Sequence, residues 1–478
     1  MTHSTRPTPP APDPQRGRVV HGVVDGEGLY YAGLATAGPF VFMSGLPVDS
    51  NGTEPDETRV PPPYHLAPAA HTHRQTNFIY HRYVELLREV GSSLADVVQI
   101  EQYIRRKPHG DPYIQASRAK GFLDRGRPAS ALISTGPLWP KHATIAHTGI
   151  AVSPAYGARK EIVPARRGRL ATLWKRLLSL LPLPVKQLLG RRLRLGRYHE
   201  SLTRASYGEA LAEEGPFNEV LTGGGYVFTV GDTAVDWEAS DIHADAKVDD
   251  LVWWGSEIRS ETEFVLSRLE SYLNRVDASL DDVVHMTVYL TDPADLYELD
   301  LVWRRRFRTD PPARTVIPCA GLGIPAFEGT DLHHRDRAVR MEQMSQSLRP
   351  GHGYTKQVVS TGVRPLTHET EAIKAGPLLW TSGLLAGDAS GLHDTRIQLD
   401  YLFTRLDAIC QAGGTTLDNL VRLRAFVTDP ADGHLVYEAL RQFIPTDPPT
   451  VIVTGVPAPL HVPGARVVLD GVAYAPEP

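Results

Sequence analysis

The residues best suited to chemistry lie in and just after the stretch 281–318. Arg314 follows an Asp-Pro-Pro turn, and the planar guanidinium of arginine matches the two oxygens of a carboxylate. His333 and His334 stand side by side in an expected strand, so only one of them can face a cleft. Histidine titrates near neutral pH and can carry a proton there. The pattern indicates either a carboxylate site with a proton carrier, or a surface ion pair with a structural histidine pair.

Metal and thiol chemistry have weaker support. His71 and His73 have an HxH spacing, but no third ligand follows at helical spacing. Cys319 and Cys410 cannot build a disulfide framework and match no zinc spacing. Because Cys319 stands among apolar residues, it is more typical of a core than of a nucleophile. We therefore expect no metal and no cofactor.

The stretch around Arg314 belongs to a unit that occurs three times. Residues 281–318 have the pattern of a strand, a turn, a helix, a turn and a second strand, and imperfect copies lie at 95–134 and 418–454. Two further strands and a helix precede each copy. These preceding helices are expected at 73–90, 257–275 and 396–412. The repeating unit is therefore β-β-α-β-α-β, which predicts an α+β fold with two helices on one face of each sheet.

Length and composition agree with three soluble domains. A chain of 478 residues is too long for one core, and no run of about 18 apolar residues is present to span a membrane. The net charge of −5 argues against a dedicated nucleic-acid binder. Residues 1–17 are polar and rich in proline, which is typical of a disordered tail and not of a signal peptide. We expect a cytoplasmic protein.

The spacing of the copies indicates an insert. Leu94, Leu280 and Leu417 are equivalent, and the first interval exceeds the second by about fifty residues. The excess falls at 156–205, where many Lys and Arg residues stand against only two acidic ones. The predicted domains, in chain order, are a tail at 1–17, a first domain at 18–155, the insert at 156–205, a second domain at 206–345 and a third at 352–478.

The insert has the pattern of two short amphipathic helices interrupted by prolines. Leucines alternate with basic residues between 159 and 197. Such a segment can lie on an anionic membrane surface, dock on a partner protein, or cover the acidic parts of its own fold. The sequence leaves these three alternatives open.

Three segments resemble the signature segments of the RidA/YjgF family, the enamine and imine deaminases. They are GPFVFMSGLPVD, SLDDVVHMTVYLTDPADLYELDLVWRRRF and DPPARTVI, and they recur in this order in the three copies. The resemblance covers the chain outside the tail and the insert. It implies a chorismate-mutase-like fold and a trimer with pockets between subunits. Here three domains of one chain would form that trimer.

The resemblance also implies which residues form the site. Arg314 occupies the place of an arginine that clamps the substrate carboxylate, whereas the first copy has Ser130 and the third lacks the Ala-Arg pair. The other family positions, each given for the first, second and third copy, are the acid/base glutamate at Ala146, His333 and Val468, a tyrosine at Tyr30, Phe217 and Glu369, a helix asparagine at Ala116, Asp300 and Tyr437, and a serine at Ser44, Val230 and Ser382. The catalytic candidates are His333, Asp300 and Glu369, and the substrate-binding candidates are Arg314, Tyr30, Phe217, Ser44 and Ser382.

Three functions fit these residues. The first is a RidA-like enzyme that acts on a small carboxylate-bearing molecule in the cleft around Arg314. The second is a chorismatase-like enzyme acting on a chorismate-type acid, and the third is a non-catalytic ligand-binding or scaffolding protein. An enclosed cleft at Arg314, with a titratable residue of a neighbouring domain within about 5 Å, would favour an enzyme. A cleft filled by side chains would favour the scaffold.

Overall fold

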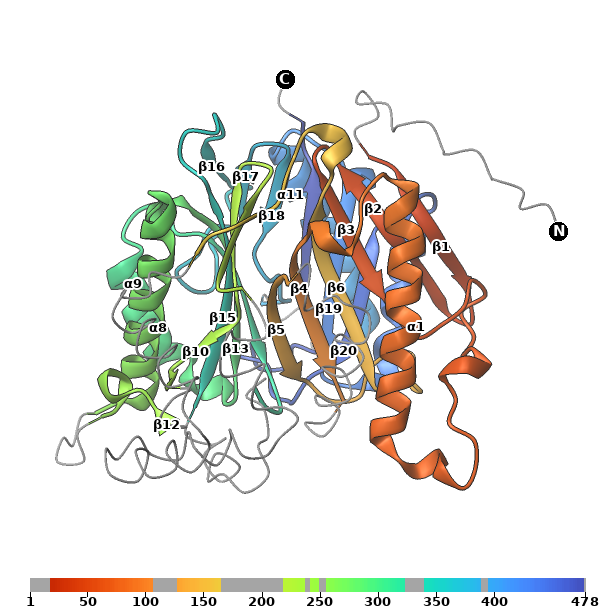
Figure 1. Cartoon of the computed structure of the whole chain (residues 1–478). Coiled ribbons are helices and arrows are strands. Elements are labelled where there is room, and N and C mark those ends of the chain that lie inside the picture. The colour runs from red at the N-terminus through yellow and green to blue at the C-terminus, as the bar shows by residue number, and fades with distance from the viewer. Residues whose placement is uncertain are drawn as a thin grey trace, which may run out of the picture.

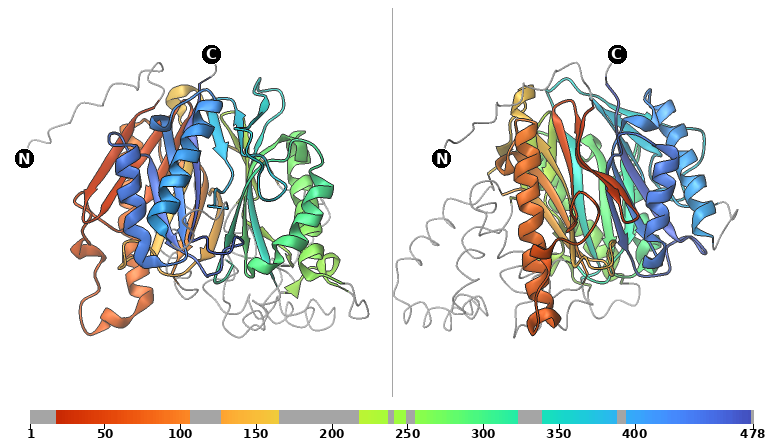
Figure 2. Two further views of the ribbon diagram at one scale, coloured as in Figure 1. Left: turned by 180° about the vertical axis from the view of Figure 1, so that it is seen from behind. Right: turned by 90° about the vertical axis from the view of Figure 1, so that its right-hand side faces the viewer.

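The computed structural model describes residues 18–105, 127–164, 218–236, 241–248, 255–322, 339–387 and 394–476. Three mixed sheets stand side by side around the middle of the molecule, and the helices lie on the outside (Figure 1). Figure 2 shows helices of the third copy on the side opposite the viewer of Figure 1. This arrangement confirms the predicted α+β fold of three repeats.

The first sheet has the strand order β1-β2-β3-β6-β4-β5. Its elements are β1 (Val20–Gly26), β2 (Leu29–Ala37), β3 (Phe40–Gly45), α1 (Pro68–Glu89), β4 (Val97–Ile104), β5 (Ala129–Ser134) and β6 (Ile145–Val152). Strands β4 and β5 are parallel, and the other neighbours are antiparallel. The second helix expected in this copy falls at residues outside the described part of the chain.

The second sheet has the equivalent order, read from its other end as β7-β8-β9-β15-β13-β14. Its elements are β7 (Glu161–Ile162), β8 (Val220–Gly223), β9 (Tyr226–Thr229), α8 (Glu257–Leu273), β13 (Val283–Leu290), α9 (Leu296–Arg306), β14 (Ala313–Pro318) and β15 (Met341–Leu348). A short strand, β10 (Asp232–Thr233), also pairs with β15, and β11 (Val235–Asp236) pairs with β12 (Asp241–Ile242).

The third sheet repeats the order as β16-β17-β18-β21-β19-β20. Its elements are β16 (Lys356–Val359), β17 (Ala372–Ala375), β18 (Leu378–Thr381), α11 (Thr395–Ala412), β19 (Leu420–Val427), α12 (Gly433–Phe443), β20 (Thr450–Gly455) and β21 (Val467–Tyr474). Helix α12 buries Leu435, Val436 and Leu440 at the i, i+1 and i+5 positions of one apolar face.

The three copies are joined in a ring by backbone hydrogen bonds between sheets. The N–H of Gly383 donates to the carbonyl of Arg314, and the N–H of Gly231 donates to Ser130 in the same way. At the third junction the N–H of Ala32 donates to the carbonyl of Pro449. Each copy therefore contacts both others, as expected for a trimer built within one chain.

The start of the expected insert belongs to the second sheet. Strand β7 lies next to β8, in the place that β1 and β16 hold in the other sheets. The predicted boundary between insert and second domain, at 205/206, therefore leaves out the first strand of that sheet. Both proposed amphipathic helices lie outside the described residues, which resume at 218.

A cation before each first strand supports this assignment. Arg18, which precedes β1, donates to two carbonyl oxygens of the third copy. Lys356 in β16 likewise donates to the carbonyls of Asp281 and Asp310 in the second copy. Lys160, which precedes β7, lies near Asp96 of the first copy, and burial lowers its pKa to about 8. The same link thus occurs at all three junctions.

No helix in the described part of the chain is long and apolar enough to cross a membrane. Among the same residues, no group of three or more His, Cys, Asp or Glu side chains is arranged to hold a metal ion.

Candidate functional site

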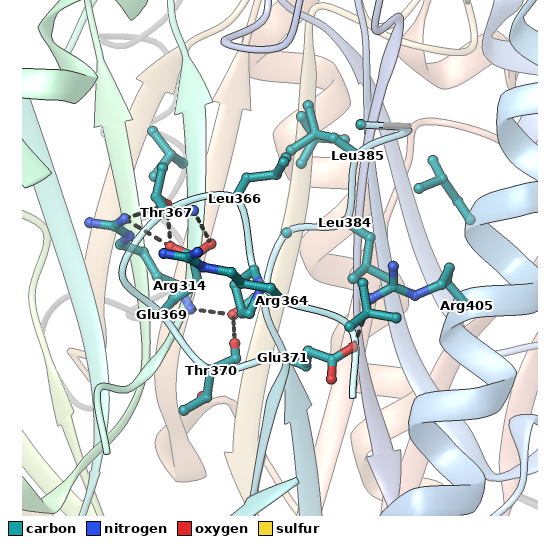
Figure 3. Close-up of a pocket in the computed structure, with 18 of the residues that line it drawn as sticks. Arg314, Arg364, Leu366, Thr367, Glu369, Thr370, Glu371, Leu384, Leu385 and Arg405 are labelled. Atoms are coloured by element: carbon teal, nitrogen blue, oxygen red, sulfur yellow. Dashed lines mark hydrogen bonds and ion pairs between the residues drawn. The ribbon is translucent and has the colours of Figure 1, made fainter. Parts of the chain in front are cut away.

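A pocket of about 250 Å³ lies between the second and third copies. Strand β14 supplies one wall, and the segment 363–371, the end of β18, helix α11 and the loop before β21 supply the others (Figure 3). Its polar or charged lining residues are Arg314, Arg364, Thr367, Glu369, Thr370, Glu371, Ser382, Tyr401, Arg405 and His461. The apolar part is formed mainly by Val316, Val363, Leu366, Leu384, Leu385, Leu402 and Val468.

Arg314 reaches the site from β14 and pairs with carboxylates of two different copies. Its Nη2 donates to Asp300 Oδ1 and to Glu369 Oε2, each at 2.8 Å, and to Thr367 Oγ1 at 2.6 Å. The guanidinium carbon lies 4.4 Å from the centre of the Trp303 ring. Its Nε and Nη1 have no hydrogen-bond partner among the described residues. The side chain is fully buried.

Asp300 is fixed from several directions. It lies on α9, where Arg304 donates to Oδ2 at 2.7 Å from one turn further along the helix. The backbone N–H of His368 donates to Oδ1 at 3.3 Å. Burial raises the pKa of Asp300, but the Arg314 charge and these hydrogen bonds outweigh burial and hold the pKa below its usual value.

Glu369 comes from the segment that precedes β17. Besides Arg314, its carboxylate accepts hydrogen bonds from the backbone N–H of Thr367 at 3.3 Å and from the Thr367 hydroxyl. Ser382, just after β18, accepts from the backbone N–H of Arg314 at 2.9 Å and donates to the carbonyl of Thr370 at 2.5 Å. The structure thus brings together four of the predicted site residues, Arg314, Asp300, Glu369 and Ser382.

His461 lines the same pocket and was missed by the sequence analysis. It stands in the loop between β20 and β21, in the segment PLHVPG. Burial lowers its pKa to about 4; the Glu369 charge opposes this shift, and the Arg314 charge adds to it. The imidazole is therefore neutral at pH 7 and can accept a proton. A lone histidine in a loop carries no signal beyond its residue type, so only the folded arrangement links it to Arg314.

A second ion pair lies on the other side of the pocket. Arg405, from α11, donates from Nη2 to Glu371 Oε1 at 2.7 Å, and Figure 3 shows this pair across the pocket from Arg314. Ser360 and Thr361 also donate to Glu371, so its oxygens are fully used. Arg364 is exposed on the segment between the two pairs.

The remaining predicted residues lie elsewhere. Tyr30 packs under Arg441, whose guanidinium carbon is 4.5 Å from the ring centre, at the junction of the first and third copies. Ser44 lies at the same junction and donates to the carbonyl of Val451 at 2.5 Å. His333 and Phe217 fall outside the described residues.

Comparison with known proteins agrees with the repeated fold. The family model described as Endoribonuclease L-PSP matches residues 207–328 and 361–475. A RutC family protein from Pyrococcus abyssi is 28% identical over 108 residues, which is 23% of this chain and 76% of that protein. A RutC family protein from Synechocystis is 27% identical over 115 residues, 24% of this chain and 81% of the relative. This chain belongs to the RidA/YjgF family.

Solved structures match one copy at a time. A YjgF/YER057c/UK114 family member from Mycobacterium tuberculosis is 27% identical, with a TM-score of 0.23, and the match covers 25% of this chain and 100% of the other. RidA from an Antarctic Psychrobacter is 23% identical, also with a TM-score of 0.23, and the match covers 25% of this chain and 98% of that protein.

The register of the last strands corrects the place of the RidA acid/base glutamate in the second copy. Strand β15 begins at Met341, after the segment that holds His333, so His333 is not equivalent to Ala146 and Val468. The residues paired with Tyr103, Tyr289 and Phe426 of the neighbouring strands are Ala146, Glu342 and Val468. The second copy therefore does carry a glutamate at this place.

Two further places shift by one residue. The register of the β2–β3 and β17–β18 hairpins makes Tyr31, not Tyr30, equivalent to Glu369. The parallel pairs β13–β14 and β19–β20 make Val451 equivalent to Arg314. A slip of one residue in a strand moves the side chain to the opposite face, so these corrections change which residue faces the junction.

The RidA arginine and glutamate of the second copy lie at different junctions. Arg314 shares its pocket with Val468 of the third copy. Glu342 instead lies against the first copy, because a Cβ placed on Gly231 would come within 2.1 Å of its Oε1 and within 2.8 Å of the Cβ of Ala131. At that junction Ser130 stands where the arginine would be. Neither of these two junctions holds both groups.

The junction of the third and first copies has lost its charges. The places of the arginine, the loop carboxylate and the helix carboxylate are taken by Val451, Tyr31 and Tyr437. All three are buried. The ion-paired arrangement is therefore a property of the pocket between the second and third copies.

Proposed function

We propose that this chain is a RidA-like enzyme that hydrolyses the C=N bond of a small imine or enamine bearing a carboxylate. The reaction would take place in the pocket between the second and third copies. The observation that carries the proposal is the grouping of Arg314, Glu369 and the neutral His461 around one enclosed cavity. Glu369 comes from the neighbouring copy and lies 2.8 Å from Arg314, which meets the criterion for an enzyme set out from the sequence.

In this proposal Arg314 holds the substrate carboxylate through its paired N–H groups. Water then adds to the carbon of the C=N bond, whose π electrons pass to nitrogen. His461 takes a proton from the water and delivers a proton to the nitrogen, because Val468 cannot do so from the place of the family glutamate. The C–N bond breaks, ammonia leaves and a carbonyl group remains. One water is consumed for each ammonia released.

The test is ammonia release from a small 2-imino acid generated in the assay. His461→Gln should lower kcat by roughly 10²- to 10⁴-fold and leave the binding of a 2-oxo acid product nearly unchanged. His434→Gln, on the exposed face of α12, is the matched control and should keep wild-type turnover. Wild-type turnover in His461→Gln would remove this histidine as the proton carrier. Absence of turnover in the intact chain would remove the proposed reaction.

A non-catalytic ligand-binding role is the second candidate, and one observation favours it. The place of the acid/base glutamate in this pocket is held by Val468, and Arg314 already pairs with two carboxylates. Such a protein would bind a 2-oxo acid and release no ammonia from any imine. Binding and turnover measured on the same preparation separate the two candidates.

A further inference from the structure

Two carboxylates share the Arg314 guanidinium, and they are held in different ways. Asp300 belongs to the same copy, lies on a helix and has further bonds to Arg304 and to the backbone of His368. Glu369 belongs to the other copy and lies on the segment between β16 and β17. Apart from Arg314, its hydrogen bonds are to Thr367, two residues away on the same segment. Asp300 is therefore a fixed partner, while Glu369 depends on the position of its segment.

The segment that carries Glu369 is weakly packed. Val363 and Leu366 are 42% and 54% exposed although both are apolar, and Arg364 between them is also exposed. Gly362 has a φ of +87°, a conformation that other residues rarely adopt. Val363, Leu366 and Glu369 all line the pocket. A movement of this segment would therefore open the pocket and withdraw Glu369 from Arg314 together.

The other junction of the third copy provides a comparison within the chain. Where Val451 replaces the arginine, Tyr31 and Tyr437 replace both carboxylates. Carboxylates thus accompany the buried cation and are missing where the cation is missing. This is expected from physics, because a buried guanidinium without a counter-charge costs several kcal/mol.

We propose that Glu369 is an internal occupant of the carboxylate site on Arg314, and that an anionic ligand binds by taking its place. The exchange replaces one carboxylate with another, so the charge around Arg314 is preserved. Glu369 keeps its bonds to Thr367 after it is displaced, because both residues move on the same segment. A neutral ligand cannot make this exchange, which restricts the pocket to small carboxylates. The choice of ligand class rests on the proposed function.

The exchange makes a distinctive prediction for Glu369→Gln. An internal competitor lowers the apparent affinity by the fraction of molecules in which the site is open, so its removal should tighten binding. Calorimetric titration with 2-oxobutanoate, a stable product-like acid, should show an affinity at least ten-fold higher in Glu369→Gln than in the wild type. Glu263→Gln is the control, since Glu263 pairs with Arg305 and Arg306 on the surface. It should bind as the wild type does.

A second variant covers loss of folding in Glu369→Gln. Glu369→Asp keeps the charge that Arg314 needs but shortens the side chain, so its affinity should rise by a smaller factor. Equal or weaker binding in a folded variant, or no binding in either the wild type or the variants, would overturn the exchange. Ammonia release is scored separately. Tighter binding without turnover would leave the exchange standing and remove the enzymatic proposal, and turnover without tighter binding would do the reverse.

Discussion

Glu261 in α8 occupies a place that glutamine holds in the other two copies. Gln75 and Gln398 each accept a hydrogen bond from the backbone N–H that precedes the last strand, and each donates to a carbonyl two residues earlier. Glu261 accepts the equivalent bond from Arg340 at 2.8 Å, but its Oε1 has no partner among the described residues. Burial raises the pKa of Glu261 to about 8, against the opposing effect of the backbone bonds. A protonated Glu261 would match the glutamines.

We expect Glu261→Gln to stabilise the protein, and to do so more at high pH. Because the folded-state pKa is about 8 and the unfolded value is 4.5, the native state holds the extra proton between these values. Wild-type stability should therefore fall as the pH rises from about 4.5 to 8 and then level off. Urea unfolding should show a gap of roughly 4 kcal/mol at pH 9 and little gap at pH 4.

The reverse change, Gln398→Glu, should introduce the same pH dependence into the third copy. A gap between wild type and Glu261→Gln that does not vary with pH would show that this carboxyl is ionised in the folded protein throughout.

At the scale of elements, the strands and helices with strong periodicity were predictable. Helices expected at 257–275 and 396–412 are found as α8 and α11 within two residues at each end. The strand Val283–Leu290 is found with the predicted bounds. These segments have apolar faces that pack within their own copy, so their patterns can be read without knowledge of the neighbours.

Strand β15 was missed because its partners lie in other parts of the ring. Its sequence, MEQMSQSL, is polar but fully buried. Gln346 bonds to Gln99 of the first copy, and Ser345 lies 2.9 Å from Thr229 of β9. A polar strand at the centre of an assembly has no alternating apolar pattern, so the sequence gives no local signal for it. Misplacing this strand is what assigned His333 to the site.

The site was predictable to the extent that the repeat supplied it. Arg314, Asp300, Glu369 and Ser382 each stand at a fixed offset in the repeating unit, and the structure places them together. His461 and Arg405 come from a loop and a helix face where no motif surrounds them. Their role depends on the packing of the third copy against the second, which spacing along the chain does not reveal.

The place of β7 gives a prediction about the insert. Deleting residues 167–214 and joining the ends with a short Gly-Ser linker should leave a single cooperative urea transition, because the excess length lies beyond the strand. A longer deletion, 159–214, also removes Lys160 and β7, and should lower the unfolding free energy. Loss of cooperative unfolding in the shorter deletion would mean that the removed residues belong to the core. Equal stability of the two deletions would deny β7 a structural role.

At the scale of the whole molecule, three equivalent strand positions meet at the centre and carry different residues. They are Glu101 in β4, Thr287 in β13 and Arg424 in β19. Arg424 donates to Glu101 at 2.6 Å and to Thr287 at 3.0 Å. Three identical copies would place three like charges at this point, which is unfavourable in a buried site. Fusion into one chain allows the three positions to differ, so the central charges can be balanced.

Asp470 completes the balance. It accepts from Arg424 Nε at 2.9 Å and Nη2 at 2.5 Å, while Glu101 also accepts from the hydroxyls of Tyr103 and Tyr289. Burial raises the pKa of Asp470, but the charge of Arg424 and its hydrogen bonds outweigh burial and lower the pKa to about 2. The pKa of Glu101 is lowered for the same reason. The two carboxylates therefore stay ionised at neutral pH.

This centre should contribute to acid sensitivity. Because the folded-state pKa of Asp470 is about 2 and its unfolded value is 3.8, its stabilisation is present above about pH 4 and is lost as the pH falls toward 2. We expect Asp470 alone to account for about 2 kcal/mol of the fall in unfolding free energy between pH 5 and pH 2. Asp470→Asn should show a correspondingly shallower decline in urea unfolding. A decline equal to that of the wild type would contradict the assignment.

The sign of the pH dependence should reverse around this centre when the cation is removed. Arg424→Met leaves Glu101 and Asp470 buried without their main counter-charge, which we expect to cost about 3–5 kcal/mol at pH 7. Without the arginine, burial dominates and raises the pKa of both carboxyls, so protonation relieves the variant as the pH falls. The stability gap to wild type should therefore narrow between pH 7 and pH 4. Arg304→Met, at a half-exposed pair on α9, is the control and should cost less, with little change in the gap. A gap for Arg424→Met that stays constant or widens on acidification would show that the central carboxylates are not held ionised by Arg424.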